Sequence, residues 1–118
     1  MNILAVGLGG AVGSIARYLI GLIHIHENSV FPIKTFIINI LGCALIALIS
    51  ILGIKDSQFM LFLKTGICGG FTTFSTFALE SGNLLRDGHP AVAVSYMALS
   101  VLTGVVAVML IQYSGGRG

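Results

Sequence analysis

Fifteen uncharged residues near the middle of the chain, from Thr65 to Leu79, have a composition that is unusual for an apolar segment. Glycine, threonine, serine and phenylalanine dominate the run, and Lys64 and Glu80 bound it. Glycine is a poor helix former and threonine is restricted at χ1, so the sequence predicts that a helix opens within residues 69–73. In lipid, an opened backbone is tolerated only where it is buried in protein or lines a wet cavity. We therefore expect an ion or substrate site here.

An opened helix would free backbone carbonyl groups, among them those of Gly69 and Thr72. In a twofold dimer whose broken segments cross at the axis, these carbonyls from both chains would point at one central spot. Carbonyl oxygens without a nearby acid suit Na⁺ or K⁺, whereas a divalent ion would normally demand carboxylates. The pattern predicts a monovalent cation site between two copies of the chain.

A second set of side chains in the same run could line a path for an anion. Phe74 and Phe77, at i and i+3, share one helix face, and Ser75 and Thr76 lie between them on other faces. The edge of an aromatic ring is positive and a hydroxyl group donates hydrogen bonds, so these groups could solvate a small, hard anion without a fixed cation. Two phenylalanines at this spacing are also typical of core packing, so both interpretations stay open.

Two other apolar segments carry polar side chains, which also need a polar partner. Asn39 lies in the uncharged run 35–54, where an unpaired amide would cost several kcal/mol. Its side chain could cross-link helices, or it could offer two N–H donors to an anion. Tyr96 and Ser100, at i and i+4, belong to a polar stripe on the last apolar segment.

The elements that must position these residues are membrane helices. The chain has 118 residues, of which 56% are hydrophobic and only 8% charged, and its mean hydropathy is +1.03. A soluble domain has roughly 25% charged residues, so this chain has too few to cover a water-facing surface. We predict an all-α membrane protein with a single domain, residues 1–118, of four transmembrane helices. The predicted spans are residues 2–25, 32–54, 59–83 and 90–112.

The third span is expected to be broken, because its 15 uncharged residues cover only about 22 Å as a straight helix, whereas the hydrocarbon is about 30 Å thick. Lys64 and Glu80 would then lie at the interfaces or in wet vestibules. Arg17, the charge inside the first span, could snorkel to the headgroups, tether neighbouring backbone or line an entrance. Lys34 could draw anions into a vestibule, although snorkelling is the simpler interpretation.

The basic residues divide evenly between the two sides of the membrane. Because loops alternate sides across four spans, the two termini and the connection before the third span share one side. The positive-inside rule then gives no preferred orientation, which favours a dual-topology protein whose copies pair antiparallel; a small count can also tie by chance. The residues on one side are Lys55, Lys64 and Arg117, and those on the other are Arg17, Lys34 and Arg86.

The central run resembles the signature of a known family, the Fluc (CrcB) fluoride channels of microbes. Arg17 in the first span and Asn39-Ile-Leu-Gly42 in the second match the same family, and the similarity covers all four spans. The nine matching residues are Gly69-Gly70-Phe71-Thr72-Thr73-Phe74-Ser75-Thr76-Phe77, with Glu80 after them.

The resemblance implies an antiparallel, dual-topology homodimer in a microbial cell membrane, with two pores through which fluoride leaves the cytoplasm passively. Pairing with a close paralogue stays open. A structural Na⁺ at the dimer centre would be held by the carbonyls of Gly69 and Thr72. The implied pore residues are Asn39, Phe74 and Phe77, with Ser75 and Thr76 as hydroxyl donors, and Tyr96 and Ser100 on a polar track that has Gly104 where a hydroxyl usually follows.

Two other functions compete with a fluoride channel. A proton-coupled exporter of the small multidrug-resistance type is also a four-span protein, but it needs a carboxylate deep in the first span, where this chain has Arg17 and no acid. A non-transporting helical subunit would leave the polar groups in the spans as uncompensated costs. None of these functions involves enzymatic catalysis or a nucleic-acid partner.

Overall fold

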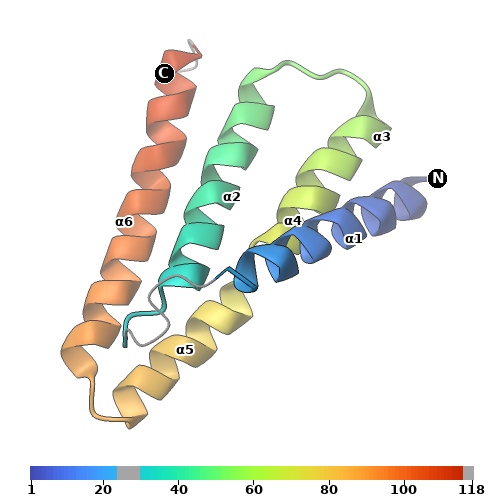
Figure 1. Ribbon diagram of the computed structural model, residues 1–118. Helices are drawn as coiled ribbons and strands as arrows, with labels where there is room; N and C mark the ends of the chain where they lie inside the picture. Colours follow the sequence, from blue (N-terminus) through green and yellow to red (C-terminus); the bar gives the residue numbers. More distant parts are fainter. Residues whose placement is uncertain (24–29, 116–118) are drawn as a thin grey trace.

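The computed structural model describes residues 1–23 and 30–115, and their regular structure is entirely helical (Figure 1). Three helices are long and apolar enough to cross a membrane. The end of the first predicted span, residues 24–25, and Arg117 of the charge count lie outside the described residues. The three long helices are α1 (Asn2–Gly21), α2 (Ile33–Ile51) and α6 (Pro90–Ser114).

The segment between α2 and α6 is a helix in two halves. At the junction, Thr72 (φ −84°, ψ 156°) and Thr73 (φ −147°, ψ 113°) are extended, which confirms the predicted opening. Of the two expected causes, the threonines lie at the opening, but the unwinding expected at the glycine pair is wrong, because Gly69 is helical (φ −63°, ψ −37°) and the helix continues to Phe71. The elements are α3 (Ser57–Met60), the π-helix η1 (Leu61–Cys68), α4 (Gly69–Phe71) and α5 (Phe74–Arg86).

The glycines of this segment serve a close helix crossing instead. α1 lies across η1 and α4 (Figure 1). A Cβ atom built on Gly70 would lie 2.6 Å from the carbonyl oxygen of Gly10, and one on Gly66 would lie 2.7 Å from the Cα of Gly9. Gly13 of α1 is equally confined, against the backbone at Ile67. Small residues thus let the two backbones touch, as in other membrane helix pairs.

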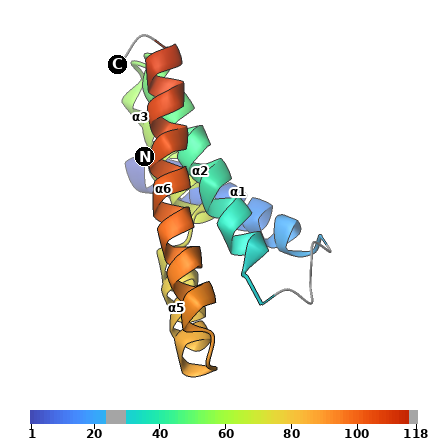
Figure 2. The ribbon, with the colours of Figure 1, turned by 90° about the vertical axis from the view of Figure 1, so that its left-hand side faces the viewer.

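The broken segment also contacts two other long helices, α2 and α6. Before the break it contacts α2, and after the break α5 packs against α6, which also packs along α2. A buried cluster of Leu84, Ala93 and Tyr96 joins α5 to α6. α1 projects away from the layer that α5 and α6 form (Figure 2).

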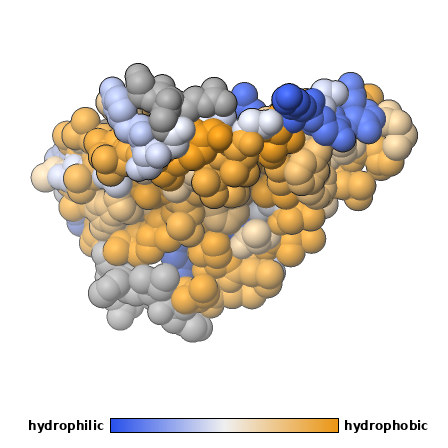
Figure 3. Space-filling view, turned by 90° about the horizontal axis from the view of Figure 1, so that it is seen from above, coloured by the Kyte–Doolittle hydropathy of each residue, from blue (hydrophilic) through white to orange (hydrophobic). Residues whose placement is uncertain are grey.

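The surface is largely apolar, and hydrophilic residues gather mainly at one edge of the face in Figure 3. Leu8, Val12 and Ile15 of α1 and Leu102 and Leu110 of α6 are all about half exposed or more. Such side chains are suited to a hydrocarbon solvent rather than to water.

Candidate functional site

The break between α4 and α5 is held by one side chain of α2. The Nδ2 group of Asn39 donates to the carbonyl oxygen of Thr73 over 3.2 Å, and the Thr73 N–H donates to Oδ1 of Asn39 over 3.0 Å. Both polar groups of an extended residue are therefore satisfied by one amide, as a backbone in lipid requires. The second hydrogen of Nδ2 is not used in this pair.

Other backbone groups at the break have partners too. Nε of Arg17 donates to the carbonyl oxygen of Gly70 over 3.2 Å, so the cation of the first span caps the carboxyl end of α4. This is the tethering role among the three expected for Arg17. The hydroxyl of Thr73 accepts the N–H of Thr76 over 3.1 Å and so caps the amino end of α5. The Thr72 hydroxyl donates to the Cys68 carbonyl over 2.9 Å.

Within the described ranges 1–23 and 30–115, the structure records no hydrogen-bond donor for three carbonyl groups at the break, those of Gly69, Phe71 and Thr72. The N–H group that would normally reach the Gly69 carbonyl belongs to Thr73, and it is directed to Asn39 instead. Gly69 is exposed, and the space around it is open. No group of three His, Cys, Asp or Glu in the same ranges could hold a metal ion. The ligands that this part of the chain could offer to a cation are therefore carbonyl oxygens, which suit a monovalent ion.

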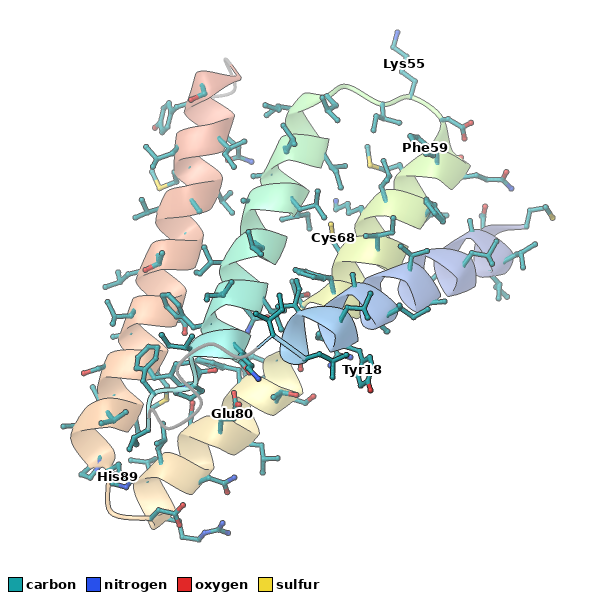
Figure 4. The ribbon with its side chains drawn as sticks, in the orientation of Figure 1. Tyr18, Lys55, Phe59, Cys68, Glu80 and His89 are labelled. Carbon is teal, nitrogen blue, oxygen red and sulfur yellow. The ribbon has the colours of Figure 1, made fainter. Side chains whose placement is uncertain are left out.

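A cavity of about 450 Å³ lies beside the break, between α2, the broken segment and α6. Its lining is mostly apolar, with a few polar groups that converge from different helices, which is typical of a binding site. Cys68 of η1 points toward α2 (Figure 4). The residues that line it are Asn39, Gly42, Cys43, Ile46, Lys64, Cys68, Gly69, Thr72, Thr73, Phe74, Phe77, Ser100 and Val101.

The cavity brings together only part of the predicted site. Ser100 lines the cavity, and its hydroxyl is buried with no hydrogen-bond partner in the described part of the chain. Ser75, Thr76 and Tyr96 do not line it, and Ser75 is exposed at the surface. The predicted residues that do line it are Asn39, Gly69, Thr72, Phe74, Phe77 and Ser100.

The aromatic ring of Phe77 connects the cavity with the buried cluster that joins α5 to α6. The centroid of the Phe77 ring lies 5.9 Å from the centroid of the Phe74 ring and 5.0 Å from that of the Tyr96 ring. Tyr96 is fully buried, and its hydroxyl donates to Oε1 of Glu80 over 3.1 Å. Glu80 lies on α5 close to α6 (Figure 4). Phe74 is different, because 78% of it is exposed although it lines the cavity.

Lys34 is engaged with backbone. Its Nζ donates to the carbonyl oxygen of Gly21 over 2.8 Å, at the carboxyl end of α1. A cation there stabilises the helix terminus. A role of Lys34 in attracting anions stays a prediction.

The residues of the cavity lining that sequence reasoning missed include Cys43, Lys64 and Cys68. The spacing of these residues along the sequence could have identified them. Lys64, Cys68 and Thr72 lie four residues apart, as do Asn39 and Cys43, and residues at this spacing share one helix face. Lys64 was expected at an interface or in a wet vestibule, as a boundary of the uncharged run, but its position on that helix face was overlooked.

The chain matches known proteins over most of its length. The family model described as CrcB-like protein, Camphor Resistance (CrcB), matches residues 4–112. A protein of Ruminiclostridium cellulolyticum, named fluoride-specific ion channel FluC, is 48% identical over 114 residues, covering 90% of this chain and 88% of its own length. Proteins of the same name from Chlorobium chlorochromatii (44% identical; 92% and 88% covered) and Azobacteroides pseudotrichonymphae (38%; 92% and 91%) are similar as well. The chain therefore belongs to the CrcB family, and it is a multi-pass integral protein of the cell membrane.

Proposed function

We propose that this protein is a fluoride-selective channel that lets F⁻ leave the cytoplasm passively and so relieves fluoride toxicity. The observation that carries the proposal is the cavity at the break, which Asn39, Phe77 and Ser100 line, together with the buried Ser100 hydroxyl that has no partner in the described part of the chain. The names of the relatives identify fluoride as the ion, and the groups at the cavity could stabilise a small anion.

The groups at the cavity can replace water around fluoride without binding it too tightly. The Ser100 hydroxyl and the second N–H of Asn39 are neutral donors, and the edges of the Phe74 and Phe77 rings are weakly positive. α5 begins at the cavity wall with Phe74, so the positive end of its helix dipole adds to the same field. Conduction requires an ion to enter and also to leave, and a series of weak contacts permits both.

No energy-coupling group is needed for such a channel. HF enters acidified cells and dissociates in the more alkaline cytoplasm, and the membrane potential then drives F⁻ outward. None of the described residues that line the cavity has a carboxylate, and a proton-coupled exporter of cationic drugs would require one.

We further infer that the working unit is an antiparallel homodimer of this single four-helix domain, and pairing with a close paralogue stays open. The exposed Phe74 ring and the open face at Gly69 both adjoin the cavity, so a second copy would complete its wall. The even division of basic residues supports copies inserted in both orientations. Added lysines on either side, read with a topology reporter, should lock the chain one way; an unmodified chain that inserts only one way would contradict dual topology.

The proposed dimer would bring the Gly69 and Thr72 carbonyls of two chains together, and we propose that they hold a structural Na⁺. Both carbonyls lack donors in the described part of the chain, and Gly69 opens toward the space that a second copy would fill. A bound Na⁺ would offset the repulsion between carbonyl dipoles that face one another across the interface.

Efflux from proteoliposomes tests the proposed function. Purified protein in vesicles loaded with potassium fluoride, with valinomycin to carry the counter-charge, should release fluoride to an external electrode without a pH gradient. Release that depends on a proton gradient, or uptake of cationic dyes driven by one, would favour the exporter instead.

A further inference from the structure

One charged side chain lies at the cavity without a role in the architecture. Among the described residues that line the cavity, Lys64 alone carries a charge. It lies on η1 about two helical turns before the break at Thr72, on the face that Cys68 also occupies.

The ammonium of Lys64 is free to meet an anion. Within residues 1–23 and 30–115, the structure records no hydrogen bond or ion pair of its side chain, and the residue is exposed. The other basic residues differ: Arg17 caps α4, Lys34 caps α1 and Arg86 bonds to Asn83. Lys55, the fifth described basic residue, extends from the loop between α2 and α3, away from the helices (Figure 4).

The apolar cavity walls strengthen the electrostatic field of Lys64, and its exposure leaves the ammonium group accessible to an anion. Apolar walls lower the local dielectric, so a cation in the lining of a cavity attracts anions over a longer distance than on an open surface. Lys64 is exposed in the single chain, so an anion can reach its ammonium group. A cation in this position raises the local concentration of anions at the cavity.

We propose that Lys64 is the electrostatic capture residue of the channel, which draws fluoride into the rim of the cavity before the neutral donors near Asn39 and Phe77 take it over. This inference rests on the proposed function. It assigns Lys64 to the rate of entry at low anion concentration, whereas Asn39, Phe77 and Ser100 solvate the ion further in.

Charge variants at low and high ionic strength test the proposal. Fluoride efflux is measured for the wild type, Lys64→Gln, Lys64→Arg and Lys64→Glu, with Lys55→Gln as the matched control for loss of one lysine outside the cavity. Vesicles contain low fluoride, and an impermeant salt sets the ionic strength.

We expect Lys64→Gln to slow efflux about tenfold at low ionic strength, and Lys64→Glu to slow it further, because electrostatic steering raises association rates by about 10-fold to 1,000-fold. Lys64→Arg and Lys55→Gln should conduct like the wild type. At about 1 M salt, where the screening length is about 3 Å, all five rates should agree within about twofold. Equal rates of Lys64→Gln and wild type at low ionic strength would overturn the capture role, and so would a loss that high salt does not reduce.

A chemical variant keeps the test independent of folding. Lys64→Cys in a background with Cys43→Ala and Cys68→Ala is purified, reconstituted and modified with a reagent that adds either an aminoethyl or a sulfonatoethyl group. The aminoethyl group should raise efflux at low ionic strength above that of the unmodified protein, and the sulfonatoethyl group should lower it. The same rates with both reagents would overturn the proposal. Failure of the wild type itself to release fluoride would instead refute the proposed function.

Discussion

Asn39 of α2 replaces an absent helical turn for Thr73, because its amide pairs with both the N–H and the carbonyl of that residue, over 3.0 and 3.2 Å. This pair also fixes the orientation of the amide, since Oδ1 must face the N–H and Nδ2 must face the carbonyl. Cross-linking and anion donation, the two roles expected for Asn39, are therefore compatible. The first uses one hydrogen of Nδ2 and leaves the other for the cavity.

Replacing Asn39 should cost both stability and conduction. In Asn39→Ala the two backbone groups of Thr73 lose their partners, and at about 1–3 kcal/mol for each unsatisfied group we expect a loss of about 2–6 kcal/mol. Asn39→Asp would set a carboxylate against the Thr73 carbonyl and a negative charge in the path of an anion. Fluoride efflux should fall at least about tenfold in Asn39→Asp.

The matched control for Asn39 is Ser50→Ala on the same helix, where the lost hydroxyl bonds only to the Ala47 carbonyl. Thermal unfolding in detergent and efflux from vesicles measure the two effects. Asn39→Ala with the stability of Ser50→Ala, or Asn39→Asp with wild-type efflux, would contradict this role.

Phe77 should be needed for conduction more than for folding. Phe77→Ile keeps an apolar side chain beside Tyr96 but removes the aromatic ring, and with it the positive ring edge, from the cavity lining. We expect fluoride efflux to fall close to that of empty vesicles. Phe59→Ile is the control, because Phe59 stacks on Phe62 outside the cavity, and retained efflux in Phe77→Ile would remove the ring from the ion path.

Hydropathy and residue type predicted the helical membrane architecture and located the broken segment, because these features depend on local composition. The cause of the break was not predictable in the same way. Gly69 and Gly70 have low helix propensity, yet they stay helical, and the helix opens at Thr72–Thr73 because Asn39 supplies the competing hydrogen bonds. A tertiary contact from 34 residues away thus overrides propensity.

Other parts of the site also depended on contacts that sequence does not display. The π-helical turn of η1 has no signature in its residues, and the tether from Arg17 to the Gly70 carbonyl was one of several open roles. Tyr96 was expected on the ion path, but in the single chain it is fully buried against Glu80 and Phe77. Its role in a pore stays a prediction.

The crossing of α1 over η1 and α4 should tolerate no added methyl group. In Gly13→Ala the new Cβ would overlap the backbone at Ile67, and such overpacking typically costs about 1–3 kcal/mol. Gly7→Ala on the same helix meets open space and should be neutral or stabilising by up to about 1 kcal/mol. Thermal unfolding of the two variants compares them directly, and equal stability would argue against close contact at Gly13.

Removal of Na⁺ should loosen the proposed dimer. If the Gly69 and Thr72 carbonyls hold Na⁺ between two chains, exchange of sodium for a large organic cation should lower the unfolding temperature and raise the monomer fraction. Light scattering and thermal unfolding in detergent, repeated with sodium restored, measure both quantities. A dimer that is equally stable without any small monovalent cation would contradict the proposed site.

The selectivity of the reconstituted protein tests the central claim most directly. Vesicles loaded with fluoride or with chloride, at equal concentration and with the same counter-cation, are compared for passive anion release to an ion-selective electrode. We predict rapid release of fluoride, and release of chloride no faster than from protein-free vesicles. Equal release of the two anions, or no release of fluoride by folded protein, would contradict a fluoride-selective path through this cavity.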